Sequence, residues 1–160
     1  MGRPGVRRTL YGQIAVTAPA NPARSDHWLR AIGYGLLAEI STVLTIILVT
    51  VVYRYVLSRG LSDAQYGAFN DRVGEVVGIV GGTLFTFLFA RRLMRHLSSR
   101  FVAHGIVLAL VAVALSVGGS IAGHHDVPRA YILASVLKLA AGVFAGSAYA
   151  RGFGRNQKVV

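Results

Sequence analysis

The chain has 160 residues, of which 54% are hydrophobic and 14% charged, and its mean hydropathy is +0.55. A soluble domain carries about 25% charged residues, so this composition argues against a soluble enzyme and against a disordered chain. The formal net charge is +11 and there is no cysteine, which excludes disulfides, thiolate metal sites and cysteine nucleophiles. A positive charge of this size is typical of nucleic-acid-binding proteins, but also of membrane proteins with basic cytoplasmic loops.

The first segment, 1–27, is basic and we expect it to be a largely disordered cytoplasmic tail. Arg7 and Arg8 are similar to the start of a twin-arginine signal, but polar residues and prolines separate them from the first apolar run. That run is also too long for the core of a signal peptide, so we expect the tail to stay uncleaved. A membrane domain is then expected over 28–152, followed by a short cytoplasmic tail over 153–160.

Four apolar runs occupy the predicted membrane domain, at 31–52, 73–90, 101–123 and 130–150. A helix needs about 20 apolar residues to cross the hydrocarbon core of a bilayer, and all four runs qualify. The backbone must satisfy its own hydrogen bonds in lipid, so these runs should be α-helices. Short connections favour neighbours that run in opposite directions. The sequence therefore predicts an all-α fold, an antiparallel bundle of four transmembrane helices.

The connection between the first two predicted helices has room for structure of its own. Ser62 and Gln65 have the spacing of a capping box, in which each side chain bonds the other residue's backbone N–H. We therefore predict a short helix over 63–69 that lies on the outer membrane surface.

The basic residues give the orientation, because Lys and Arg concentrate on cytoplasmic loops. One side of the predicted bundle carries twelve of them: Arg3, Arg7, Arg8, Arg24, Arg30, Arg91, Arg92, Arg95, Arg100, Arg151, Arg155 and Lys158. The other side carries four: Arg54, Arg59, Arg72 and Arg129. Both termini are therefore expected in the cytoplasm, and the charge needs no nucleic-acid partner.

Glu39 and Lys138 fall deep inside predicted membrane spans, which makes them functional candidates, whereas Glu75 lies two residues inside the outer end of the second span and can reach water. Glu39 lies about 12 Å from the inner end of the first helix, and Lys138 about 12 Å from the outer end of the fourth. In a core of about 30 Å their backbones differ in depth by roughly 6 Å, which a lysine side chain can span. We expect them to meet, either as a structural ion pair between the two helices or as a site that handles protons or cations.

Small residues mark the faces on which transmembrane helices approach each other closely. The glycines that form such stripes are Gly74, Gly78, Gly82, Gly119, Gly123, Gly142 and Gly146. We interpret them as packing positions inside the bundle. The alternatives are a transport path or a seam between copies.

The histidines and the search for catalytic motifs give little support for a metal site, a haem site or an enzymatic activity. His104 lies near the cytoplasmic end of the third helix, but His27 falls in the tail and His96 in a loop, which disfavours a haem between facing histidines. His124, His125 and Asp126 are adjacent in a tight loop and rarely converge on one metal ion. No phosphate loop or catalytic triad pattern is visible, so we expect no metal, no cofactor and no enzymatic activity.

A segment of the first helix, Leu37-Ala38-Glu39-Ile40, resembles the glutamate segment of small multidrug-resistance transporters. Those are also four-helix proteins, and the resemblance implies that Glu39 would couple protons to cation export.

A second resemblance covers the middle of the chain. It rests on Gly81-Gly82, Ala90-Arg91-Arg92 and His104-Gly105 followed by an apolar helix. This pattern is similar to small bacterial integral membrane proteins with four helices and no assigned activity. It implies a multi-pass protein of the bacterial cytoplasmic (inner) membrane.

Two functions remain open at this point. The first is a non-enzymatic membrane protein that packs, alone or against other subunits, as a structural or accessory component. The second is a small proton-coupled transporter or channel that uses Glu39. Few polar side chains line the predicted helices and no proline interrupts them, which favours the first function.

Overall fold

The structure, a computed structural model, describes residues 26–122 and 129–156, and all the regular secondary structure in these ranges is helical. The elements are α1 (Asp26–Val52), η2 (Tyr53–Leu57), α2 (Asp63–Val76), η3 (Val77–Gly81), α3 (Gly82–Met94), α4 (Phe101–Ala122) and α5 (Arg129–Asn156). The two η elements are π-helical turns that continue the α-helices beside them. Four helices are therefore long and apolar enough to cross a membrane, as predicted: His27–Leu57, Asp63–Met94, Phe101–Ala122 and Arg129–Gly152.

The capping box at Ser62 is present, but the helix that it starts is longer than predicted. The Ser62 side chain accepts from the backbone N–H of Gln65, and Gln65 Oε1 accepts from the backbone N–H of Ser62 at 3.0 Å. Instead of ending at residue 69, the helix continues without a break from Asp63 to Met94. The polar stretch 70–72 marks the end of the apolar run rather than the end of the helix, because a helix can extend beyond the hydrocarbon.

The other ends differ from prediction for the same reason. α1 begins at Asp26 rather than 31, and α5 continues to Asn156 rather than 150. At the far end of the first helix, the ring of Tyr53 stacks on Phe69 of α2 with 3.5 Å between centroids. These aromatic side chains hold the α1–α2 hairpin together where few apolar residues are buried.

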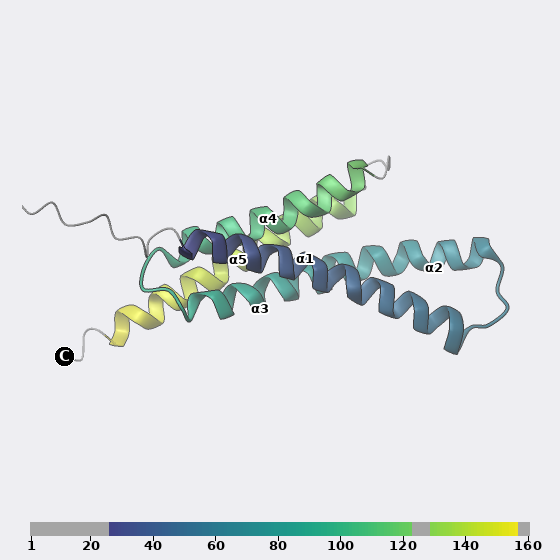
Figure 1. Cartoon of the computed structure of the whole chain (residues 1–160), viewed down its shortest axis with the longest axis horizontal. Coiled ribbons are helices and arrows are strands. Elements are labelled where there is room, and N and C mark those ends of the chain that lie inside the picture. Colours follow the sequence, from purple (N-terminus) through teal and green to yellow (C-terminus); the bar gives the residue numbers. More distant parts are fainter. Residues whose placement is uncertain (1–25, 123–128, 157–160) are drawn as a thin grey trace, which may run out of the picture.

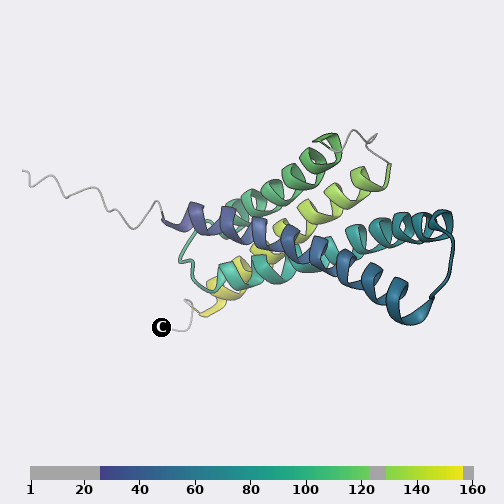
Figure 2. The ribbon, with the colours of Figure 1, turned by 45° about the vertical axis from the view of Figure 1, so that its right-hand side comes forward.

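Figures 1 and 2 show α4 and α5 side by side, with the α1–α2 hairpin extending past them on one side. The core lies near the connection between α3 and α4. Its buried members are Ala31, Ala90, Leu93, Met94, Leu97, Phe101, Leu108 and Ala145. Elsewhere large apolar side chains point outward: Leu44, Ile47 and Leu48 are 52% to 62% exposed. Outward apolar faces suit contact with lipid rather than water.

Candidate functional site

Glu39 of α1 and Lys138 of α5 meet in the interior of the bundle. Nζ of Lys138 donates to Oε2 of Glu39 at 2.7 Å. The Lys138 side chain is 3% exposed and the Glu39 side chain 15% exposed. The structure therefore contains the pair that the depths of the two residues predicted, although they are 99 positions apart in the sequence.

A third helix joins this pair through Ser116 of α4. The Ser116 hydroxyl donates to Oε1 of Glu39 at 2.7 Å and accepts from Nζ of Lys138 at 2.5 Å. Both carboxylate oxygens thus have a donor, and the ammonium has two acceptors. The predicted pair did not include Ser116, although Ser116 lies one turn after the buried Ala112, on a line of small residues that faces the bundle.

The fourth helix provides space for the lysine head group through Gly82 at the start of α3. A Cβ atom on Gly82 would lie 2.6 Å from Cε of Lys138 and 3.3 Å from its Nζ, so any side chain at position 82 would displace the lysine head group. Thr42 of α1 also borders this point, and its hydroxyl is turned back to the carbonyl oxygen of Ala38 at 2.9 Å. We call Glu39, Ser116 and Lys138 the intramembrane network. All four membrane-spanning helices contact it.

One polar atom next to the network has no partner among the described residues. Thr86 lies one turn after Gly82, its side chain is fully buried, and its Oγ1 makes no hydrogen bond with residues 26–122 or 129–156. A buried hydroxyl without a partner is uncommon and is often explained by an ordered water.

The predicted glycine stripes are right for some positions and wrong for others. Gly82 packs against Lys138, Gly142 lies against the backbone of Gly105, and Gly146 lies against the backbone at Val102. A Cβ added at Gly74, Gly78 or Gly119 would meet nothing within 4 Å, so these three do not pack inside the chain. Gly123 lies outside the described residues.

The π-helical turn η3 explains the error in the second span. The stripe through Gly74, Gly78 and Gly82 assumed that residues four apart lie on one face of a regular α-helix. The turn at Val77–Gly81 is wider because its hydrogen bonds span five residues, so Gly82 faces a different direction from Gly74. Two further glycines pack closely in the structure. Gly35 lies against the carbonyl oxygen of Leu108, and Gly105 begins a small-residue line that continues to Ala109.

A second cluster lies at the end of the bundle where α4 begins. His27, which the sequence assigned to the tail, is in α1 and places its ring 6.5 Å from that of His104, centroid to centroid. Trp28 stacks on the other side of the cluster, 4.1 Å from the His104 ring. His96 is exposed and takes no part. The predicted separation of His27 from His104 is therefore wrong, because α1 begins earlier than its apolar run.

Metal chemistry has no visible basis in the part of the chain that the structure describes. No group of three or more His, Asp or Glu side chains gathers there in a way that could hold an ion. His124, His125 and Asp126 lie outside the described residues. No family model, curated protein or solved structure matches the chain.

Proposed function

We propose that the chain is a non-catalytic integral membrane protein that acts as a structural or accessory helix-packing subunit. The observation that carries this proposal is the pairing of the two buried charges within the intramembrane network. Nζ of Lys138 is held by Glu39 and Ser116, and the backbone at Gly82 closes over its Cε atom. A buried pair in which each charge is held by the other and by a hydroxyl fixes the helices relative to each other and leaves neither charge free for a transported ion.

We also propose the orientation of the chain in the membrane and the kind of membrane that it occupies. Helix order and the short connections support an antiparallel bundle, and the excess of Arg and Lys on one side supports cytoplasmic termini. The resemblance to small bacterial four-helix proteins supports the cytoplasmic (inner) membrane of a bacterium. Nucleic acid is not among the proposed partners, because the basic residues border the spans as the positive-inside distribution requires.

The proposed partners are the lipid bilayer and other helices, from a second subunit or a second copy. Gly78 and Gly119 support this, because both leave open space where a side chain would be. Small residues on an outward face let another helix approach closely in lipid. Packing of this kind is what an accessory subunit would contribute.

A small proton-coupled transporter or channel is the second candidate. Two observations favour it: the Glu39 side chain keeps 15% exposure, and the buried Thr86 Oγ1 nearby has no partner in the described ranges. A water beside Thr86 would extend the polar groups from α3 toward the network. The resemblance around Glu39 to small multidrug-resistance transporters points the same way.

Proton flux into liposomes that contain a trapped pH-sensitive dye separates the two candidates. The variants are Glu39→Gln and, as a matched control, Glu75→Gln, which changes an exposed carboxylate in the last turn of α2. The structural proposal predicts no flux above that of protein-free liposomes for any protein, with lower thermal stability for Glu39→Gln alone. Flux that Glu39→Gln abolishes and Glu75→Gln retains would overturn the structural proposal and establish the transporter.

A further inference from the structure

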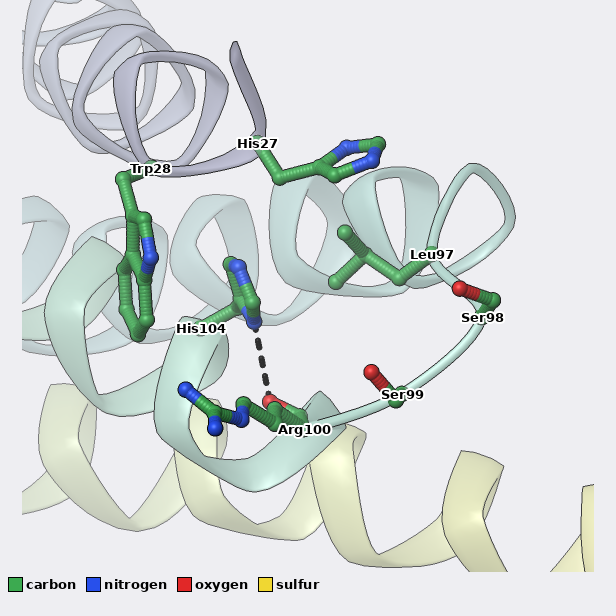
Figure 3. Close-up of a pocket in the computed structure, with 7 residues that line it drawn as sticks. All are labelled: His27, Trp28, Leu97, Ser98, Ser99, Arg100 and His104. Carbon is green, nitrogen blue, oxygen red and sulfur yellow. Dashed lines mark hydrogen bonds between the residues drawn. The ribbon is translucent and has the colours of Figure 1, made fainter. Parts of the chain in front are cut away.

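A small pocket lies where α1 begins and where the α3–α4 connection enters α4. Its lining comes from His27, Trp28, His104 and residues 97–100 (Figure 3). The connection joins two candidate membrane spans, so the pocket lies near a membrane boundary. Trp28 suits this depth, since tryptophan is enriched at the level of lipid headgroups.

Two buried ring nitrogens at this pocket have no partner within the described residues. His104 is 5% exposed, and its Nδ1 lies 2.9 Å from the carbonyl oxygen of Arg100, to which it must donate. Its Nε2 is buried and unpartnered, and so is Nδ1 of His27. Figure 3 shows that the unpartnered nitrogen of His104 lies on the side of the ring toward His27. Buried polar atoms of this kind call for a water, an ion or a ligand.

Arg100 gives the pocket its charge and its shape. Its φ is 56°, the left-handed conformation that residues other than glycine seldom adopt and that gathers at functional sites. Figure 3 shows its guanidinium on the side of the His104 ring that bonds the Arg100 carbonyl oxygen; the side chain is exposed, and no ion pair occupies it in ranges 26–122 and 129–156. Arg91, Arg92 and Arg95 lie exposed just before the connection. This end of the bundle is therefore strongly positive.

The groups at the pocket match a phosphate. A guanidinium can bind two phosphate oxygens in a bidentate arrangement. The hydroxyls of Ser98 and Ser99 are further donors at the pocket. The first turn of α4 begins at the pocket, and its dipole favours an anion.

We propose that this pocket binds a phosphate group, and that an anionic phospholipid headgroup supplies it. The membrane-boundary position and the stacked Trp28 favour a lipid over free phosphate, because basic pockets between transmembrane helices recognise such headgroups. The pocket is separate from the intramembrane network, so the proposal stands whether that network is structural or transports protons.

Trp28 reports directly on the pocket, since it is the only tryptophan in the chain and it stacks on His104. The full-length protein in an uncharged maltoside detergent is titrated with short-chain phosphatidylglycerol, short-chain phosphatidylcholine and inorganic phosphate. We expect a saturable change in Trp28 fluorescence with phosphatidylglycerol and a much weaker one with phosphatidylcholine. An equal change with inorganic phosphate would assign the site to free phosphate, and no saturable change with any of them would refute the proposal.

Two variants and a matched control localise the binding. Arg100→Gln should raise the phosphatidylglycerol concentration for half-saturation roughly tenfold, because it removes a charge-assisted hydrogen bond. Arg95→Gln removes the same charge at the same end but outside the pocket, and it should have little effect. His104→Phe keeps a ring for Trp28 to stack on and removes Nε2, so it should also weaken binding. Equal weakening by Arg95→Gln and Arg100→Gln would show a diffuse basic surface and overturn the pocket.

Discussion

Replacing Glu39 and Lys138 singly and together measures what the intramembrane network contributes to stability. Glu39→Leu leaves the ammonium of Lys138 at 3% exposure with only the Ser116 hydroxyl as acceptor. Lys138→Met leaves the carboxylate of Glu39 with the Ser116 hydroxyl as its donor. At 15% exposure, the Glu39 side chain is less buried than that of Lys138. Removing one partner of a buried pair costs about 3–5 kcal/mol, and we expect Glu39→Leu at the upper end of this range and Lys138→Met at the lower.

The double variant should recover most of this loss. Both charges are then gone, and the Ser116 hydroxyl can still donate to the carbonyl oxygen of Ala112, which lies 3.1 Å away. No polar group of the network is then left without a partner, so the double variant should lie within about 1–2 kcal/mol of the wild type. The coupling free energy between the two positions is then several kcal/mol.

Reversible unfolding in mixed micelles of dodecyl sulfate and maltoside, followed by helical circular dichroism, gives the four free energies of the cycle. Glu75→Leu is the control, because it removes an exposed carboxylate from the same protein and should change the free energy of unfolding by less than about 0.5 kcal/mol. Single losses that simply add in the double variant would refute the network, because independent sites add and coupled sites do not.

The remaining predictions concern packing and orientation. Gly142→Ala should destabilise the bundle by about 1–3 kcal/mol in the same unfolding assay, because the new Cβ meets the backbone of Gly105, which cannot move aside. Gly119→Ala meets open space and should instead be neutral or stabilising by up to about 1 kcal/mol, and a loss as large as that of Gly142→Ala would contradict the packing. The chain has no native cysteine, so single cysteines at Ser62 and Ser98, both exposed, test the orientation with a membrane-impermeant maleimide on intact cells. Ser62→Cys should react and Ser98→Cys should not, and the reverse pattern would place the termini outside.

Hydropathy predicted the spans because a helix that crosses lipid must be predominantly apolar along the whole crossing. It predicted the helix ends less well, because α1 and α5 continue into the polar region where that requirement no longer holds. The error at α1 had a functional consequence, since it hid the contact of His27 and Trp28 with His104. No residue pattern at position 27 predicts that contact, because the contact also depends on His104, which lies in the first turn of α4.

The intramembrane network could be predicted in part, because charge in hydrocarbon is costly and depth can be counted along a helix. Glu39 and Lys138 are conspicuous for this reason. Ser116 is not, because an isolated serine is common in transmembrane helices and usually bonds to its own backbone. Gly82 was singled out for the wrong reason, as part of a stripe that η3 interrupts rather than as space for a lysine.

Polar and small residues contribute differently to this bundle. Lipid is as apolar as the side chains that face it, so apolar helices have little preference for one relative register. The contact of Gly105 with Gly142 sets how closely α4 and α5 approach, but small residues tolerate sliding. The bonds of Lys138 to Glu39 and Ser116 do not, because a shift of one turn, about 5.4 Å, would leave both charges unpaired in hydrocarbon. We therefore expect the double variant to recover its free energy of unfolding and yet unfold over a broader range of denaturant than the wild type. An equally sharp transition would show that glycine packing alone selects the register.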